Sequence, residues 1–158
     1  MRAATGPAPR LEFAFEIRVD VAEEIRIGRG PDEVLTFTPI TGGSVSGPGF
    51  TGEVLPGGGD WAVERSGTAT IEARYLIRAD DGAVVDVINR GYFRATETVV
   101  RRMDDGEDVA EDDPGLYFRT APVFTTDVPA HRWLSEHQFL GLARDEGGQV
   151  CIRVFTLL

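Results

Sequence analysis

The stretch ATIEARYLIR (Ala69–Arg78), with DDG (Asp80–Gly82) and VVDVINRGYF (Val84–Phe93) after it, decides the fold class of this chain. Apolar and polar side chains alternate along the first segment, with Tyr75 on one face and Glu72 on the other. Such a period of two residues is typical of a half-buried strand. Asp-Asp-Gly is a turn signal, so the segment after it is predicted to return as the antiparallel partner in a β-hairpin.

The same alternation extends outward in both directions. From Leu11 to Val21, apolar residues share one predicted face, namely Leu11, Phe13, Phe15, Ile17 and Val19. Further strands are expected at Val34–Thr38, Val45–Leu55, Trp61–Arg65, Leu116–Phe124, Gln138–Arg144 and Val150–Leu157, the last two joined by a turn at Asp145–Gly148. Two short helical segments are expected, Thr96–Met103 after an N-capping threonine and Pro129–Ser135.

Many short strands separated by closely spaced turns predict an all-β sandwich or barrel. Closure removes exposed strand edges, so we expect a small antiparallel β-barrel with one or two short helices, wide enough to hold one small ligand. The length of 158 residues suits one domain. We therefore predict a flexible N-terminus over residues 1–10 and a single barrel domain over residues 11–158.

Composition limits the classes of partner. A formal net charge of −10 argues against nucleic acid, because phosphate backbones require a basic surface. The sequence contains no apolar run of signal-peptide or membrane-span length, so we expect a cytoplasmic protein with no membrane partner. Cys151, the single cysteine, lies in an apolar stretch and is expected to be a packed thiol, since reactive thiols need an electropositive, accessible setting.

Three glycine-rich segments stand out, at Ile27–Gly30, Ile40–Gly43 and Leu55–Trp61. None has the Gly-Lys-Ser/Thr of a phosphate loop, so turns or bulges are the simpler interpretation. The third segment delivers Asp60 and Trp61 together at the start of a strand. A carboxylate beside an indole at a barrel rim suits an acid or base with a raised pKa, whereas the motif taken alone favours Asp60 as a cap for the loop amides.

The positions of other polar side chains on the predicted strands can be interpreted in two ways. Glu72 and Arg74 share one face, which is either solvent-exposed or turned into the lumen, and Asn89 on the partner strand raises the same question. Arg119 lies between aromatic residues, where it either pairs with a carboxylate or binds an anionic ligand.

The sequence indicates neither a metal site nor a Ser-His-Asp catalytic triad. His131 and His137, the two histidines, have no ligand-type spacing with other residues, so no metal site is expected. The acidic stretch Asp104–Asp113 is expected to be a solvated loop.

Several short motifs occur in an order and spacing that resemble the domain-of-unknown-function family 3237, also called uncharacterised protein family 0311. They run from about Leu11 to Phe155 and comprise Phe15-Glu16-Ile17, Pro39–Gly43, Leu55–Trp61, Ala73-Arg74-Tyr75, Asp80-Asp81-Gly82, Asn89-Arg90-Gly91, Tyr117–Pro122 and Trp133-Leu134. The resemblance implies a small antiparallel barrel with an internal cavity, and by analogy a lyase, isomerase or cyclase of small-molecule metabolism. The acidic stretch at Asp104–Asp113 departs from that family pattern.

These observations lead to a cofactor-independent enzyme that transfers protons in a small organic ligand inside the barrel. The expected catalytic residues are Asp60, Glu72 and Tyr75, with Arg74 and Arg119 steadying a carboxylate or enolate. The expected substrate-binding residues also include Trp61, Asn89, Phe124, Trp133 and Phe139. The alternatives are a non-catalytic carrier of a small ligand and an assembly protein, and a homo-oligomer fits each of the three.

Overall fold

The predicted hairpin is present and forms the centre of a longer sheet. The computed structural model describes residues 3, 5–28 and 30–158. Strands β6 (Thr68–Ala79) and β7 (Val84–Ala95) pair antiparallel, with Arg78 opposite Val84 across the Asp80–Gly82 turn. Ile71, Tyr75 and the residues that alternate with them face the core, as the period of two predicted.

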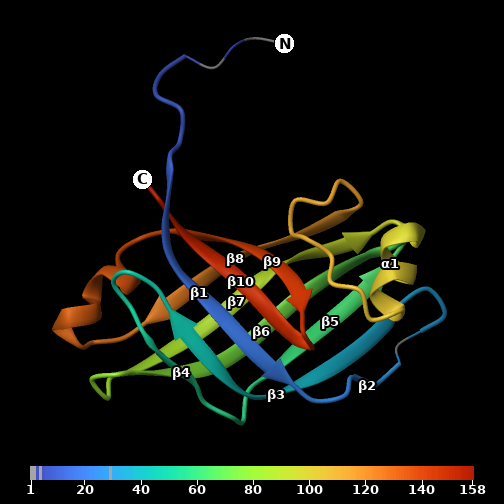
Figure 1. Cartoon of the computed structure of the whole chain (residues 1–158), viewed down its shortest axis with the longest axis horizontal. Coiled ribbons are helices and arrows are strands. Elements are labelled where there is room, and N and C mark those ends of the chain that lie inside the picture. Colours follow the sequence, from blue (N-terminus) through green and yellow to red (C-terminus); the bar gives the residue numbers. More distant parts are fainter. Residues whose placement is uncertain (1–2, 4, 29) are drawn as a thin grey trace.

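The long strands close into an antiparallel β-barrel of eight strands, which confirms the predicted fold class (Figure 1). Around the barrel the order is β1, β10, β9, β8, β7, β6, β5 and β3, and pairing of β3 with β1 closes it. Their bounds are β1 Leu11–Val21, β3 Val34–Ser46, β5 Gly59–Arg65, β8 Leu116–Thr125, β9 Phe139–Glu146 and β10 Gln149–Leu157.

Two short strands and two short helices are attached to this barrel. The two-residue strand β2 (Ile25–Arg26) and the three-residue strand β4 (Gly52–Val54) pair with β3. Helix α1 (Glu97–Asp104) begins after the N-cap Thr96, and the 3₁₀ helix η1 (Pro129–Ser135) carries Leu134 into the core, so both helical predictions are confirmed. No helix of the described residues is long and apolar enough to cross a membrane.

Strand β3 corrects the predicted break between Thr38 and Val45. The glycines of Ile40–Gly43 form no turn; they lie within one continuous strand, where a bulge shifts the register against β1. A Cβ atom at Gly43 would lie 2.0 Å from the carbonyl oxygen of Arg18. Glycine is therefore needed at this position for the two backbones to approach and close the barrel.

The other glycine-rich segments behave as turns. Gly28 and Gly30 both have positive φ, and Arg29 between them lies outside the described residues. In the last hairpin the turn is confined to Gly147 and Gly148, so that Asp145, which was expected in the turn, belongs to β9.

Strand β1 contains a second bulge that the sequence pattern did not predict. Phe13 lies opposite Phe155 whereas Phe15 lies opposite Val154, so the alternation is interrupted between them. As a result Phe15 is fully buried, while Phe13 is on the outer wall beside Phe155 and Leu11 is exposed. The prediction that Leu11 and Phe13 share the buried face was therefore wrong, because one extra residue turns the strand over.

The lumen is filled differently at its two ends. At the end near η1, aromatic rings pack against Phe15 with centroid distances from 5.2 to 6.4 Å, and they come from Phe50, Phe124, Trp133 and Phe139. These rings form an aromatic plug that fills this end of the lumen. At the opposite end, beside α1 in Figure 1, smaller side chains face inward.

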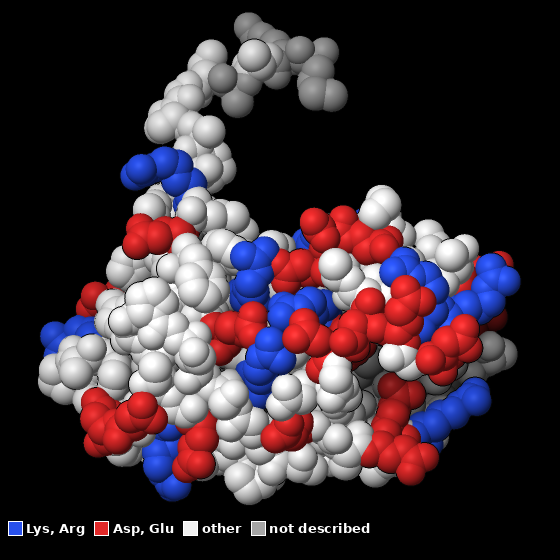
Figure 2. All heavy atoms as spheres, in the orientation of Figure 1, with Lys and Arg blue, Asp and Glu red and all other residues white. Residues whose placement is uncertain are grey.

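The acidic stretch is packed against the barrel, and the prediction of a fully solvated loop was wrong there. Glu111 is buried and ion-paired with Arg144 and Arg153, and Asp113 pairs with Arg102 of α1 at 2.8 Å. Acidic and basic side chains accordingly meet on the face of β1, β9 and β10 shown in Figure 2. Cys151 is fully buried beneath Arg18 and Arg144 of this network, as expected for a packed thiol.

A candidate binding site inside the barrel

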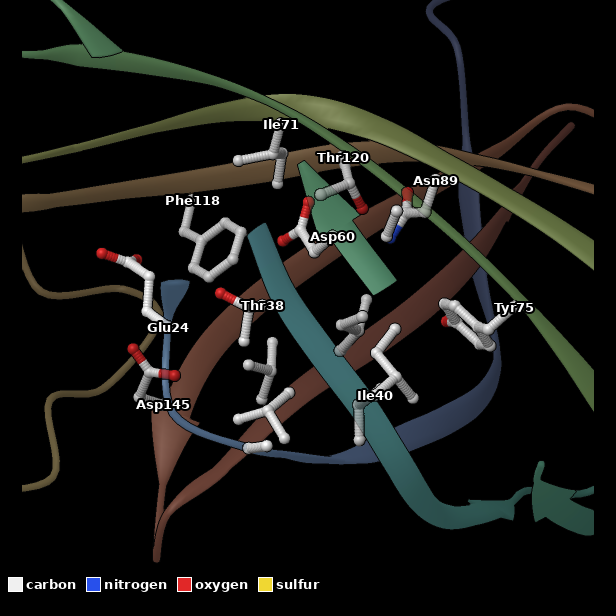
Figure 3. A pocket seen from close by; sticks show the side chains of 16 residues that line it. Glu24, Thr38, Ile40, Asp60, Ile71, Tyr75, Asn89, Phe118, Thr120 and Asp145 are labelled. Atoms are coloured by element: carbon white, nitrogen blue, oxygen red, sulfur yellow. The ribbon is translucent and has the colours of Figure 1, made fainter. Parts of the chain in front are cut away.

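A cavity of about 280 Å³ occupies the lumen at the end away from the aromatic plug (Figure 3). Most of its wall is apolar, with Val19, Ile40, Ile71 and Ile152 among the lining residues. Ligand sites are commonly concave, mostly apolar and supplied with a few convergent polar groups. The volume lies near the lower end of the range for such sites, which suits a small molecule.

Three polar residues of the cavity, Thr38, Asp60 and Asn89, come from one row of inward-facing residues. Hydrogen-bonded neighbours around the barrel place Thr38 of β3 opposite Asp60 of β5, Asp60 opposite Ala73 of β6, and Ala73 opposite Asn89 of β7. Tyr75 follows two residues after Ala73 and therefore points inward as well. Sequence-distant residues thus meet because the strands pair in this register.

The glycines before Asp60 allow its side chain to point into the lumen. A Cβ atom at Gly58 would lie 2.4 Å from the carbonyl oxygen of Arg74, and one at Gly59 would lie 2.0 Å from the Phe37 ring. Only glycine lets this turn lie flat against β6 and begin β5 with Asp60 turned into the lumen.

Four buried polar atoms around the cavity have no hydrogen-bond partner within the chain. They are Asp60 Oδ1, Tyr75 OH, Asn89 Oδ1 and Thr120 Oγ1. Among the described residues only His131 Nδ1, outside the cavity, shares this state. A buried polar group left without a partner costs roughly 1–3 kcal/mol, so a ligand or solvent that satisfies these groups is strongly favoured in the cavity. The Asp60 carboxyl group accepts a hydrogen bond from the backbone of Glu72 on β6, which is not part of the loop that it was predicted to cap.

Burial raises the pKa values of Asp60 and Tyr75. Desolvation raises the pKa of Asp60 to about 6, against a hydrogen bond from the backbone of Glu72 that lowers it, and the negative charge of Glu24 adds to the rise. Desolvation, followed by the nearby charge of Asp60, raises the pKa of Tyr75 well above its usual value. The cavity therefore contains a carboxyl group that exchanges protons near neutral pH beside a phenol that stays protonated.

Of the ten residues expected at the site, the structure brings Asp60, Tyr75 and Asn89 together (Figure 3). Glu72 and Arg74 lie on the outer wall, where Glu72 pairs with Arg90 at 2.8 Å and Arg74 with Asp86 at 3.4 Å. Of the two faces left open by the sequence, the apolar one of β6 points inward, because hydrophobic burial outweighs any gain from enclosing these charges.

Trp61 and Arg119 also lie outside the cavity. Trp61 follows Asp60 directly and so points the opposite way. It is 46% exposed and packs against Phe37, with 4.7 Å between the ring centroids. Arg119 donates hydrogen bonds to the backbone oxygens of Phe118 and Glu111, and so holds the acidic stretch against β8. Neither contacts the proposed ligand space.

Three predicted aromatic wall residues belong to the plug. Phe124, Trp133 and Phe139 pack on one another and on Phe15, and none lines the cavity. The structure adds lining residues that the sequence analysis missed, namely Thr38, Thr120, Phe118, Glu24 and Asp145. Thr120 lies two residues after Phe118 and four before Phe124 on β8. The alternation along that strand therefore indicated that Thr120 faces inward. Glu24, by contrast, lies between β1 and β2, where no periodicity applies.

No group of three His, Cys, Asp or Glu side chains in the described part of the chain is arranged to hold a metal ion. His131 instead contacts Asp81 with Nε2 to Oδ2 at 2.7 Å, and His137 contacts the backbone oxygen of Trp133.

Comparison with known proteins places this fold in a family. Residues 9–157 match the family model described as a protein of unknown function, DUF3237. A UPF0311 protein of Clostridium acetobutylicum is 38% identical over 150 residues, covering 92% of each chain. The crystal structure of a conserved protein of unknown function from Rhodopseudomonas palustris superimposes with a TM-score of 0.86 at 34% identity, covering 98% of this chain and 100% of the other.

A fungal relative is named for an enzymatic activity. The hydroalkoxylation enzyme phnH of Penicillium herquei is 31% identical over 75 residues, which covers 48% of this chain and 50% of that protein. The crystal structure of an enzyme from Penicillium herquei has a TM-score of 0.73 at 21% identity, covering 99% of this chain and 100% of that one, which supports the fold alone. From the family match and the bacterial relatives together, this chain belongs to the DUF3237 family.

Proposed function

We propose that this protein is an enzyme that moves a proton within a small organic molecule bound in the cavity, with Asp60 as the acid–base group. The observation that carries the proposal is the set of unpartnered polar atoms on Asp60, Tyr75, Asn89 and Thr120 around one apolar cavity. A packed structural core leaves few such atoms, whereas a site built for a polar substrate leaves several facing the space that the substrate fills.

The reaction class proposed is addition of a hydroxyl group across a carbon–carbon double bond, or the reverse elimination. The distant relative named for hydroalkoxylation supports this class. It falls within the lyase, isomerase or cyclase chemistry expected from the sequence, and it requires a single group that first accepts and then returns a proton.

Each step is assigned to side chains of the chain itself. The Asp60 carboxylate accepts the hydroxyl proton of the substrate while the hydroxyl oxygen bonds to the β-carbon of an unsaturated ketone. The electron pair of the double bond moves to the ketone oxygen, to which the Tyr75 hydroxyl donates a hydrogen bond, while the unpartnered Oδ1 of Asn89 accepts one from a donor group of the substrate. Asp60 then returns the proton to the α-carbon, so the product is an isomer of the substrate.

Arginine has no part in this scheme. Among the described lining residues none is Arg, Lys or His, and Arg74 and Arg119 lie on the outer wall. In this proposal the neutral hydroxyl of Tyr75 takes the role that was expected of the two arginines, which was to steady a carboxylate or enolate.

The test is incubation of the protein with a panel of hydroxyaryl enones, followed by chromatography for an isomer of unchanged mass. We expect turnover by the natural protein and by Glu72→Gln, a matched carboxylate-to-amide change on the outer wall, and a large loss with Asp60→Asn. Saturable binding of panel members without any product would favour the alternative of a non-catalytic carrier. Equal turnover by Asp60→Asn and Glu72→Gln would refute the role of Asp60.

A further inference from the structure

The mouth of the cavity carries two carboxylates that the proposed reaction does not use. Glu24 lies between β1 and β2, and Asp145 lies near the end of β9, so two separate segments bring them to the same opening. In Figure 3 both project beside Phe118 and Thr38, on the same side of Asp60.

These carboxylates differ from several of those on the outer wall. Outside the barrel, carboxylates such as Glu72, Glu111 and Asp86 each meet an arginine. Within the part of the chain that the structure describes, Glu24 and Asp145 form no ion pair. Among the described residues that line the cavity, Glu24, Asp60 and Asp145 are acidic and none is Arg, Lys or His, so the lining offers these carboxyl groups no cationic partner.

The cavity behind this mouth independently indicates a ligand. Tyr75, Asn89 and Thr120 are only 3–4% exposed, and each turns an unpartnered polar atom to the same space. The walls between them and the mouth are apolar. A molecule that matches the whole cavity therefore has a polar reacting end, an apolar middle and a positively charged end at the opening.

We infer that the cavity selects a molecule with a protonated amine, whose cation lies at the mouth between Glu24 and Asp145. This inference rests on the proposed use of the cavity as the substrate site and names the substrate class. Attraction between opposite charges at a half-buried site exceeds that at a fully exposed surface, because less water screens it. The Phe118 ring lies beside the same opening (Figure 3).

The experiment compares three probes of one shape, 3-phenylpropylamine, 3-phenylpropanol and 3-phenylpropionate, by isothermal titration calorimetry at pH 7.5. The amine is charged at that pH, the alcohol is neutral and the carboxylate is negative. We expect the amine to bind about tenfold or more tightly than the alcohol, a difference that one half-buried ion pair supplies, and the carboxylate to bind weakest.

Variants locate the effect at the mouth. The double variant Glu24→Gln, Asp145→Asn is expected to bind the amine and the alcohol with nearly equal affinity. The control Glu53→Gln removes one charge from an exposed position on β4, near the other end of the barrel, and is expected to preserve the preference for the amine. Circular dichroism verifies that each variant is folded.

Equal binding of amine and alcohol by the natural protein would overturn the inference while leaving the cavity as a substrate site. A preference for the amine that survives the double variant would overturn it too, since net charge alone would then be the cause. If none of the three probes binds, the inference fails together with the proposed use of the cavity.

Discussion

Asp60 on β5 and Asn89 on β7 project into the barrel from the same row, with Ala73 of β6 as the only residue between them. Neighbouring strands are about 4.8 Å apart, so the two side chains start roughly 10 Å from each other. The small alanine leaves the space between them open. A substrate held across Ala73 contacts a proton acceptor at one end and an amide at the other, which is the geometric basis of the predictions below.

Replacing Asp60 is expected to stabilise the protein at high pH. Its folded pKa, about 6, is above the reference value of 3.8, so the folded state binds the extra proton and stability falls as pH rises from about 4 to 6. The shift corresponds to about 3 kcal/mol. Asp60→Asn should therefore exceed the natural protein in free energy of unfolding by up to about 3 kcal/mol at pH 8, with the difference shrinking toward pH 4.

Urea denaturation at pH 4, 6 and 8 measures this difference. Glu72→Gln serves as the control, because its exposed pair with Arg90 is expected to contribute less than about 1 kcal/mol. A gain for Asp60→Asn that is the same at all three pH values would show that Asp60 is not the group that titrates.

Turnover should depend on the ionisation of Asp60. As a base it must be deprotonated, so kcat/KM of a reactive enone is expected to fall about tenfold per pH unit below the pKa of about 6 and to level off above it. The raised pKa of Tyr75 keeps that phenol protonated, so it should cause no alkaline loss below about pH 10. A profile that stays flat down to pH 4.5 would contradict the assignment.

Removing the Tyr75 hydroxyl separates stability from catalysis. This buried hydroxyl has no partner within the chain, so Tyr75→Phe is expected to leave the free energy of unfolding unchanged or to raise it by up to about 3 kcal/mol. Loss of one donor to a developing oxyanion should lower kcat by about 10²–10³. Unchanged kcat in a folded Tyr75→Phe protein, measured under saturating substrate, would remove Tyr75 from the mechanism.

Filling the space over Ala73 should block binding. Ala73→Val adds two methyl groups to the wall between Asp60 and Asn89, and valine suits a strand, so folding should be retained. The expected result is loss of the thermal shift that a bound ligand produces. Ala121→Val makes the same change on β8 opposite the outward-facing Arg90 and should keep the shift. Ligand binding that survives in Ala73→Val would place the ligand elsewhere.

Closure of the barrel should depend on Gly43. A side chain there meets the Arg18 carbonyl oxygen at 2.0 Å, so Gly43→Ala is expected to destabilise the protein by about 2–4 kcal/mol. Gly49→Ala is the matched control, since its Cβ atom would lie no closer than 3.9 Å to Trp133 and its φ is not positive. Equal melting temperatures for the two variants would mean that β1 and β3 separate at little cost.

The sequence by itself determined the secondary structure and the fold class. Alternation at Ala69–Arg78 and Val84–Phe93 predicted the hairpin, and Thr96 and Pro129 marked the two helices, because these signals act between residues close in the chain. The same alternation grouped Tyr75 with Ala73 and Glu72 with Arg74 without stating which pair faces the lumen.

Only the tertiary structure decided that question and the composition of the site. Closure turned the apolar face of β6 inward and so placed Glu72, Arg74 and Trp61 on the outer wall. The bulge in β1 and the separation of the aromatic plug from the cavity depend on contacts between strands far apart in the chain. Glu24 and Asp145 reach the mouth from separate segments, and no local periodicity encodes such a meeting, because it follows from the register in which β1, β10 and β9 pair.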